Sequence, residues 1–83
     1  MKQIEMITWH DSISLGGWQH VGDMDNWAGR TITTIGFVMQ DGDKDIVVAQ
    51  SVGNASAGEV ACNWLSIPKS CVLLRRIIGE FSA

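Results

Sequence analysis

Two apolar runs near the end of the chain are separated by one short polar step, and this arrangement constrains the fold more than any other feature of the sequence. Residues 60–67 and 71–78 have the β-branched and apolar character of strands, and Pro68, Lys69 and Ser70 lie between them. Proline has a fixed φ and no amide donor, so Pro68 is poorly placed inside a central strand. The sequence therefore predicts a sharp corner, formed by one 3-10 turn, between the last two strands of a β protein.

The clearest hairpin lies in the middle of the chain. Residues 31–40 and 46–52 are rich in β-branched and apolar side chains, and they flank a polar stretch in which Gly42 can adopt a positive φ. Alternation gives each arm a face directed toward the core. The residues expected on these faces are Ile35, Phe37 and Met39 on the first arm and Ile46, Val48 and Val52 on the second.

Residues 4–10 alternate loosely and supply the first strand, which brings the expected number of strands to five. The run 71–78 also tolerates a helix, but its short length and β-branched Val72, Ile77 and Ile78 favour a strand. Residues 53–59, rich in Gly, Asn, Ala and Ser, are typical of a mobile connector.

A long loop is predicted between the first two strands. Residues 11–30 carry four glycines and no sustained apolar run, and irregular loops of about 20 residues in small domains are often functional. The chain has four tryptophans and no tyrosine. Trp9 and Trp64 are expected to fill the core. Trp18 and Trp27, which lie in the loop, either anchor it to the core or form a binding surface, because indole combines a large apolar body with one donor.

Length and composition limit the class of protein. Eighty-three residues are expected to form one domain, 1–83. A hydrophobic fraction of 46% with only 18% charged residues suggests a very apolar interior together with a surface that another chain covers, so we expect a homo-oligomer.

The net charge of -3 and only six basic residues argue against a broad nucleic-acid-binding face. Cys62 and Cys71, without a signal peptide or apolar span, indicate a cytoplasmic protein without a disulfide.

No constellation of catalytic residues emerges from the sequence. His10 and His20 lie near aspartates, but the spacing matches no metal cage, and the two cysteines lack the paired arrangement of a zinc knuckle. Motifs for a nucleophile or a phosphate-binding loop are also missing. We therefore expect a protein that is not an enzyme and uses no cofactor or metal.

The basic residues of the last third of the chain form the remaining candidate site. Lys69, Arg75 and Arg76 are close in sequence, and adjacent arginines in a strand point to opposite faces. Such cations either keep a sheet edge soluble or bind an anionic ligand or an acidic partner. The complete set of candidate binding residues is Trp18, Trp27, His20, Arg30 and Lys69.

Several short motifs resemble a known group of proteins. They are Trp9-His10-Asp11-Ser12, Gly17-Trp18, Thr34-Ile35-Gly36-Phe37-Val38 and Ile67-Pro68-Lys69-Ser70. The pattern is similar to that of small, mostly uncharacterised proteins encoded by bacteriophages and prophages, whose outline is like an SH3-like or Sm-like barrel. The resemblance implies an accessory factor that binds a host protein, inhibits a defence system or sequesters a signalling molecule.

The sequence thus predicts a mainly β protein, a five-stranded SH3-like barrel with a long loop after its first strand and a 3-10 turn before its last. The expected function is binding without catalysis, as a host-interaction or anti-defence factor that inhibits a host protein or sequesters a small anionic ligand. The alternative is an Sm-like nucleic-acid-binding protein, in which a ring of subunits gathers one or two basic residues from each chain.

Overall fold

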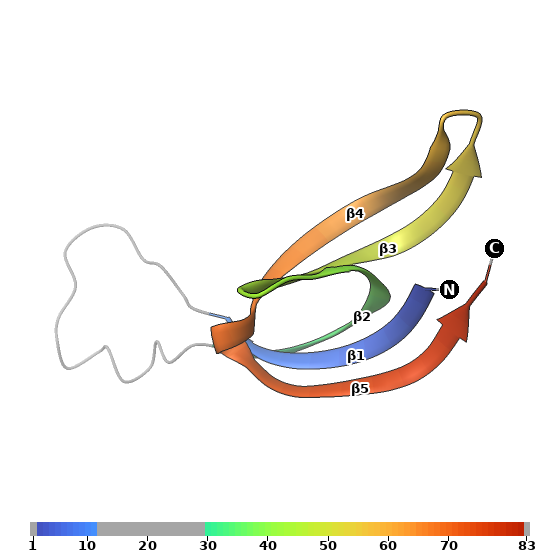
Figure 1. Ribbon diagram of the computed structural model, residues 1–83. Coiled ribbons are helices and arrows are strands. Elements are labelled where there is room, and N and C mark those ends of the chain that lie inside the picture. Colours follow the sequence, from blue (N-terminus) through green and yellow to red (C-terminus); the bar gives the residue numbers. More distant parts are fainter. Residues whose placement is uncertain (1, 12–29, 83) are drawn as a thin grey trace, which may run out of the picture.

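A computed structural model describes residues 2–11 and 30–82, which form five strands and one short 3-10 helix (Figure 1). The elements are β1 (Lys2–Asp11), β2 (Arg30–Asp41), β3 (Asp45–Ala55), β4 (Gly58–Pro68), η2 (Lys69–Cys71) and β5 (Val72–Phe81). The predicted mainly β class, the five strands and the 3-10 turn before the last strand are confirmed. Within the described residues, no helix is long and apolar enough to cross a membrane.

The strands form one antiparallel sheet in the order β4-β3-β2-β1-β5. β1 lies between β2 and β5, so it pairs with the strand that follows it and with the last strand of the chain. β4 and β5 are the two edges, and within the described residues they do not pair with each other. The sheet is strongly curved but unclosed.

The ladder between β2 and β3 is short. It runs only from the pair Phe37 and Ala49 to the pair Asp41 and Ile46, with an irregularity between. β2 pairs with β1 from Arg30 to Phe37, and β3 pairs with β4 from Asp45 to Ala55, which is its whole length. Figure 1 shows the result: the β3–β4 hairpin rises away from the layer formed by β1, β2 and β5.

Gly36 occupies the point on β2 where β3 comes closest. A Cβ atom at Gly36 would lie 2.9 Å from the backbone carbonyl oxygen of Ala49 and 3.3 Å from Cβ of Val48. Backbone atoms of a paired strand can move only slightly, so a side chain at Gly36 would force β2 and β3 apart. The absence of a side chain therefore permits the tight bend at which the hairpin leaves the layer.

The core lies on the inner side of the curve, where β1, β3 and β4 meet. Its fully or nearly buried members are Ile7, Trp9, Ile46, Val48 and Ile67, and Ile32, Val38 and Val72 pack against them. The indole Nε1 of Trp9 donates a hydrogen bond to Oγ1 of Thr34 over 3.0 Å, so the one polar group of this side chain is satisfied. The predicted core position of Trp9 is confirmed.

The structure corrects the predicted position of Trp64. Its side chain is 60% exposed on β4, and its Nε1 donates to the carbonyl oxygen of Ala61 over 3.0 Å. The reason is that β4 is an edge strand, and Trp64, paired with Ala49, lies on the face opposite that of buried Val48 and its partner Leu65.

The predicted core face of β2 is also wrong. Register with β1 pairs Ile32 with Trp9 and Thr34 with Ile7, so the even-numbered residues face the core. Ile35 is on the opposite face and is 60% exposed, while Phe37 and Met39 are only partly buried. On β3 the prediction holds for Ile46 and Val48, which are buried, whereas Val52 is only partly buried.

The expected connector over residues 53–59 is mostly strand. β3 continues to Ala55 and β4 starts at Gly58, so the turn is short, and Gly58 has a φ of 120°. A left-handed φ of this kind suits glycine and explains the tight reversal. The predicted long loop falls outside the described residues except at its two ends, where Asp11 of β1 pairs with Arg30 of β2.

Candidate functional site

The outer face of the layer formed by β2, β1 and β5 presents side chains in regular rows. One row joins Ile35, Met6 and Arg76, because Met6 pairs with Ile35 on one side and with Arg76 on the other. Opposite residues of antiparallel strands project from the same face, so these three side chains are neighbours. A second row joins Thr33, Thr8 and Leu74.

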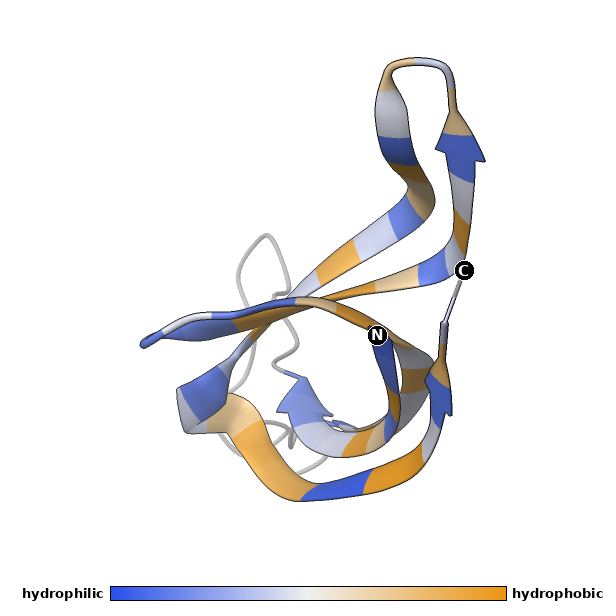
Figure 2. Ribbon diagram, turned by 45° about the vertical axis from the view of Figure 1, so that its right-hand side comes forward, coloured by the Kyte–Doolittle hydropathy of each residue, from blue (hydrophilic) through white to orange (hydrophobic). Residues whose placement is uncertain are grey.

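We call these six residues the outer patch. Ile35 and Leu74 are 60% and 54% exposed, Arg76 and Thr33 are also exposed, and Met6 and Thr8 are half-buried. The hydroxyls of Thr8 and Thr33 form a hydrogen bond of 3.2 Å between the strands. The outer patch is therefore an apolar surface on paired, regular strands, with one guanidinium at its edge. Figure 2 shows the corresponding pattern on β5, where apolar stretches flank a hydrophilic one.

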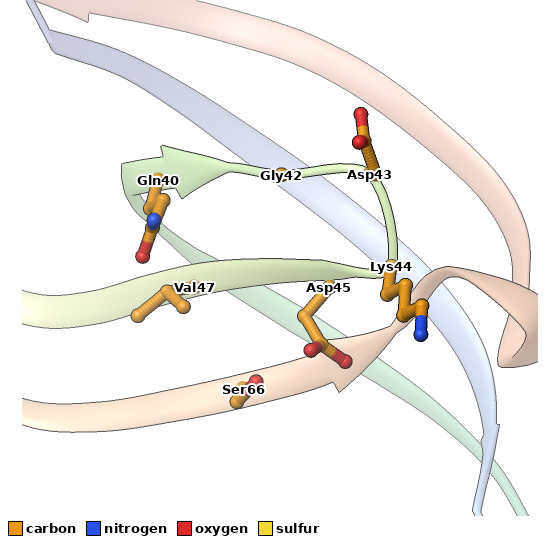
Figure 3. Close-up of a pocket in the computed structure, with 7 residues that line it drawn as sticks. All are labelled: Gln40, Gly42, Asp43, Lys44, Asp45, Val47 and Ser66. Carbon is orange, nitrogen blue, oxygen red and sulfur yellow. The ribbon is translucent and has the colours of Figure 1, made fainter.

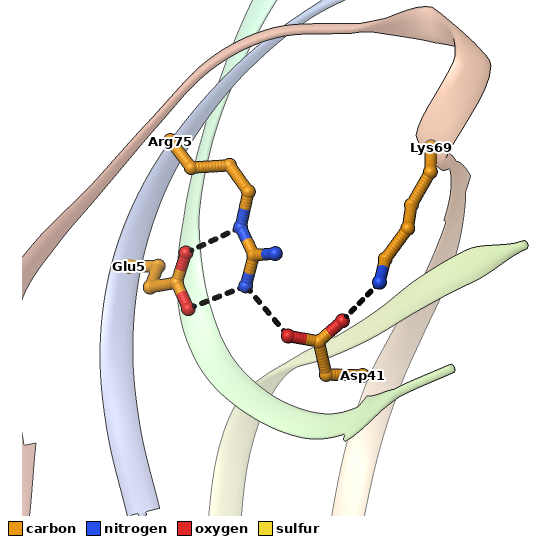
Figure 4. Close-up of polar contacts among 4 residues, drawn as sticks. All are labelled: Glu5, Asp41, Lys69 and Arg75. Atoms are coloured by element: carbon orange, nitrogen blue, oxygen red, sulfur yellow. Dashed lines mark hydrogen bonds and ion pairs between the residues drawn. The ribbon is translucent and has the colours of Figure 1, made fainter. Parts of the chain in front are cut away.

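The inner face of the same strands contains a chain of four charged side chains (Figure 4). Glu5 is 2% exposed and accepts two hydrogen bonds of 2.8 Å, from Nε and Nη2 of Arg75. Nη2 of Arg75 also donates to Oδ2 of Asp41 over 3.1 Å, and Nζ of Lys69 lies 2.6 Å from Oδ1 of the same carboxylate. The chain connects β1, β5, the end of β2 and η2.

These contacts shift the pKa values of Asp41 and Arg75. Hydrogen bonds from Lys69 and then Arg75 lower the pKa of Asp41 from its ordinary value of 3.8. Hydrogen bonds to Glu5 raise the pKa of Arg75 above its ordinary value, although its partial burial acts in the opposite direction. The cluster is a set of paired charges that links β1, β2, η2 and β5.

The predicted orientation of the two adjacent arginines is confirmed. Arg75 pairs with Ile7 on the inner face and contacts Glu5, whereas Arg76 pairs with Met6 on the outer face. One arginine is therefore committed to the fold, and the other is presented to solvent beside apolar side chains.

The residues predicted as a binding site have different positions. Lys69 lies in η2 and is engaged with Asp41, and Arg30 begins β2 as an exposed residue opposite Asp11. No hydrogen bond or ion pair within residues 2–11 and 30–82 joins Arg30 to Lys69. Trp18, His20 and Trp27 lie outside the described residues.

A hollow of about 530 Å³ adjoins the turn between β2 and β3 (Figure 3). It is lined by Gln40, Gly42, Asp43, Lys44, Asp45, Val47 and Ser66. In Figure 3 the carboxylates of Asp43 and Asp45 point in different directions, so they do not converge on a common point where a cation would sit. The turn is closed by a hydrogen bond of 2.9 Å from the amide of Gly42 to the carbonyl oxygen of Asp45. We attribute the polar residues that line this hollow to the structure of the turn between β2 and β3.

Comparisons with models of protein families, with curated proteins and with solved structures find no match for this chain. The functional argument consequently depends on the side chains themselves. Within the described part of the chain, no three His, Cys, Asp or Glu residues gather as metal ligands do. The outer patch remains the surface with the most distinctive chemistry.

Sequence reasoning missed the outer patch. Its apolar members were expected inside, as for Ile35, or were treated only as strand formers, as for Leu74. The available signal was that β1, β2 and β5 carry apolar residues on both faces, while a small sheet buries only one of them. Arg76, placed on the face opposite Arg75, was the residue that marked the exposed side.

Proposed function

We propose that the protein acts by binding, without catalysis, and that the outer patch recognises a partner that presents an anionic group beside an apolar surface. The single observation that carries this proposal is the row of Ile35, Met6 and Arg76, in which an exposed guanidinium lies beside half-buried Met6 and the row ends at exposed Ile35. The partner is an acidic segment of a host protein or a small anionic ligand with an apolar part.

The composition of the outer patch supports this proposal. Methionine and arginine are enriched in protein interfaces, and arginine is among the residues that most often dominate their binding energy. Met6 also adapts its shape to different neighbours, because its side chain is unbranched and polarisable. The surrounding sheet holds these side chains in place, since β1 is hydrogen-bonded on both sides. A rigid surface loses little entropy when it binds.

The sequence motifs support a proposal for the biological setting. We propose that this is a phage or prophage protein with an SH3-like fold, that it works in the host cytoplasm, and that it acts as a host-interaction or anti-defence factor. The five antiparallel strands and the 3-10 turn before the last strand agree with such a scaffold. Trp18 and Trp27, together with His20, remain predicted contributors, and they lie outside the described residues.

The proposal is tested by comparing the partners retained by the wild-type protein and by two variants of the outer patch. In the first, Ile35→Thr and Leu74→Thr remove apolar area, and in the second, Arg76→Met removes the charge but keeps the length of the side chain. Val60→Thr on β4 is the matched control, because Val60 is a similarly exposed apolar residue outside the patch. We expect the same host protein or small molecule to be lost from both patch variants and kept by the control. Equal retention by all four proteins would refute the patch assignment.

The nucleic-acid alternative is separated from this proposal by its dependence on salt. Three of the six basic residues, Lys2, Lys69 and Arg75, are already in ion pairs, which reduces the cations available to phosphates. A nucleic-acid complex should weaken steeply as salt increases, because it releases counterions. An interface dominated by apolar contacts with one arginine should respond much less.

A further inference from the structure

The two edge strands of the open sheet share an unusual property: each exposes apolar side chains on both faces. On β5, Leu74 faces outward beside Thr8, and Ile77 faces inward beside Glu5, yet both are exposed. On β4, Trp64 is on the face of Ala49 and Leu65 is on the face of buried Val48, and both are again exposed. A strand added beside either edge would give these side chains cross-strand neighbours on each face.

The backbone of these strands is also incompletely paired. β4 bonds only to β3 and β5 only to β1 within the described residues. Natural sheets usually protect such edges with inward-pointing charges, proline or very short strands. Here β4 has 11 residues with its proline at the last position, and β5 has 10 residues. β5 has two register shifts against β1 and the inward-pointing Arg75, but this charge is already paired with Glu5 and Asp41 of the same chain. Both edges are therefore suited to accept another extended strand.

We propose that the occupant is a second copy of this chain, with β4 of one copy pairing with β5 of the next. The two edges are nearly equal in length, and exposed apolar side chains on each face of one edge meet exposed apolar side chains on the corresponding face of the other. This contact is made through the free edges of the sheet, and it shares only Leu74 and Arg76 of β5 with the outer patch.

Charge favours this head-to-tail arrangement over pairing of β5 with itself. β5 contains Arg75, Arg76 and Glu80, whereas β4 contains no Lys or Arg and has one acidic residue, Glu59, which is paired with Lys2. Two antiparallel β5 strands related by a two-fold axis would bring both arginine pairs together near the centre of the contact, and like charges in neighbouring positions destabilise a sheet. Pairing β5 with β4 places its arginines against a strand without cations.

A contact between two different edges can propagate, so it gives either a closed ring or an open filament. The first measurement is the mass of the wild-type protein by light scattering at micromolar to submillimolar concentrations. We expect a species larger than two chains at the upper end. A single chain at every concentration would overturn the proposal.

Two variants place lysines on one edge each, as natural edge strands do. One carries Val60→Lys and Trp64→Lys on β4, and the other carries Leu73→Lys and Ile78→Lys on β5; all four side chains are exposed. Each variant alone should be monomeric. An equimolar mixture should form a two-chain complex that grows no further, because one intact β4 edge meets one intact β5 edge. Thr31→Lys, which places a lysine at an exposed position of the central strand β2 outside the outer patch, should leave the oligomer of the wild-type protein intact.

Other results of these experiments would contradict the proposal. If the β4 variant still assembled while the β5 variant did not, β5 would pair with itself and the proposal would fail. Assembly by both variants would exclude the edges altogether. Should a variant not fold, as judged by circular dichroism, hydrogen exchange of the wild-type protein replaces it. Amides of β4 and β5 should then lose protection on dilution while those of β1 and β2 keep it, and unchanged protection of the edges would contradict the proposal.

Discussion

The inner and outer faces of β1 and β5 give an arginine opposite surroundings: the inner one is paired with carboxylates, and the outer one is exposed. Each face receives one arginine from the same strand, since Arg75 and Arg76 are adjacent in sequence. On the inner face the guanidinium of Arg75 is matched by the buried carboxylate of Glu5 and by Asp41. On the outer face Arg76 pairs across the strands with Met6, and the row continues to exposed Ile35. The comparison shows that residue type alone does not distinguish an arginine that holds the fold from one that is available to a partner.

The two faces differ in the free energy that an unpaired charge would cost. A carboxylate excluded from water, such as Glu5, is tolerated only with well-placed donors, whereas an exposed arginine is stabilised by solvent. Substitutions on the inner face should therefore change the free energy of unfolding, and those on the outer face should change binding. The following predictions examine that division.

The largest effect is expected for Arg75→Met. The variant leaves Glu5 buried without its partner, and removal of one member of a buried pair costs about 3–5 kcal/mol. Arg76→Met, the matched change one residue away, should remain within about 0.5 kcal/mol of the wild type. Urea denaturation of both variants measures the difference. Equal losses at the two positions would show that the faces are not distinct.

Gly36→Ala should have the next largest effect. The new Cβ atom would lie 2.9 Å from the carbonyl oxygen of Ala49, and overpacking of this kind costs about 1–3 kcal/mol. Gly79→Ala is the control, because there the nearest atom is Cδ1 of Ile4 at an ordinary 3.7 Å. Thermal unfolding should show a lower melting temperature for the first variant only. A neutral Gly36→Ala would mean that β3 moves away from β2 without cost.

A smaller effect is expected for Asp41→Asn, and it should depend on pH. The folded-state pKa of Asp41 is lowered, so its contribution to stability is present above its ordinary pKa of 3.8 and is lost as pH falls through the folded value. At neutral pH the variant should be less stable by up to about 1 kcal/mol, because the carboxylate is largely exposed. The difference between the two proteins should shrink as pH falls below 3.8. A difference that is unchanged in acid would place the effect on packing instead of charge.

The smallest effect on stability is expected for Ile35→Thr. Its side chain is mostly exposed, so the change should stay within about 0.5 kcal/mol. Ile7→Thr, at a fully buried position of β1, is the contrasting variant and should destabilise the protein strongly. Parallel urea titrations compare them. If Ile35→Thr proved as harmful as Ile7→Thr, the outer face would be covered in solution, and the patch would not be free to bind.

Local signals in the sequence were sufficient to predict much of the fold. The polar turn at Gly42 defined the β2–β3 hairpin, and Pro68 marked the end of β4 and the start of η2. These features depend on a few neighbouring residues, whose φ restrictions are visible in the sequence itself. The short turn before Gly58 was harder to predict, because small residues such as Gly53 and Ala55 occur both in strands and in connectors.

The choice of core face could not be predicted in the same way. A period of two shows that Ile35 and Phe37 share a face, but the face that becomes buried depends on register with β1. When both faces carry apolar residues, single-strand patterns do not decide between them. The outer patch was missed for this reason, and Trp64 was assigned to the core for the related reason that its edge position depends on the whole sheet.

The contact between Glu5 and Arg75 could not be predicted from local sequence patterns, because the two residues are 70 positions apart in the chain. No spacing rule connects a lone glutamate in the first strand to one of two arginines in the last. Only the topology, which places β1 between β2 and β5, brings them together.

That topology has a consequence for the order of events during folding. The β2–β3 and β3–β4 hairpins join neighbours in sequence and can form early, but β1 acquires its second partner only when the last strand of the sheet arrives. Closing so long a loop slows folding, and sheets dominated by distant pairings typically fold in milliseconds to seconds. On the ribosome, the first strand to be synthesised has to wait for the last one, and until then Ile7 and Trp9 remain without their complete surroundings.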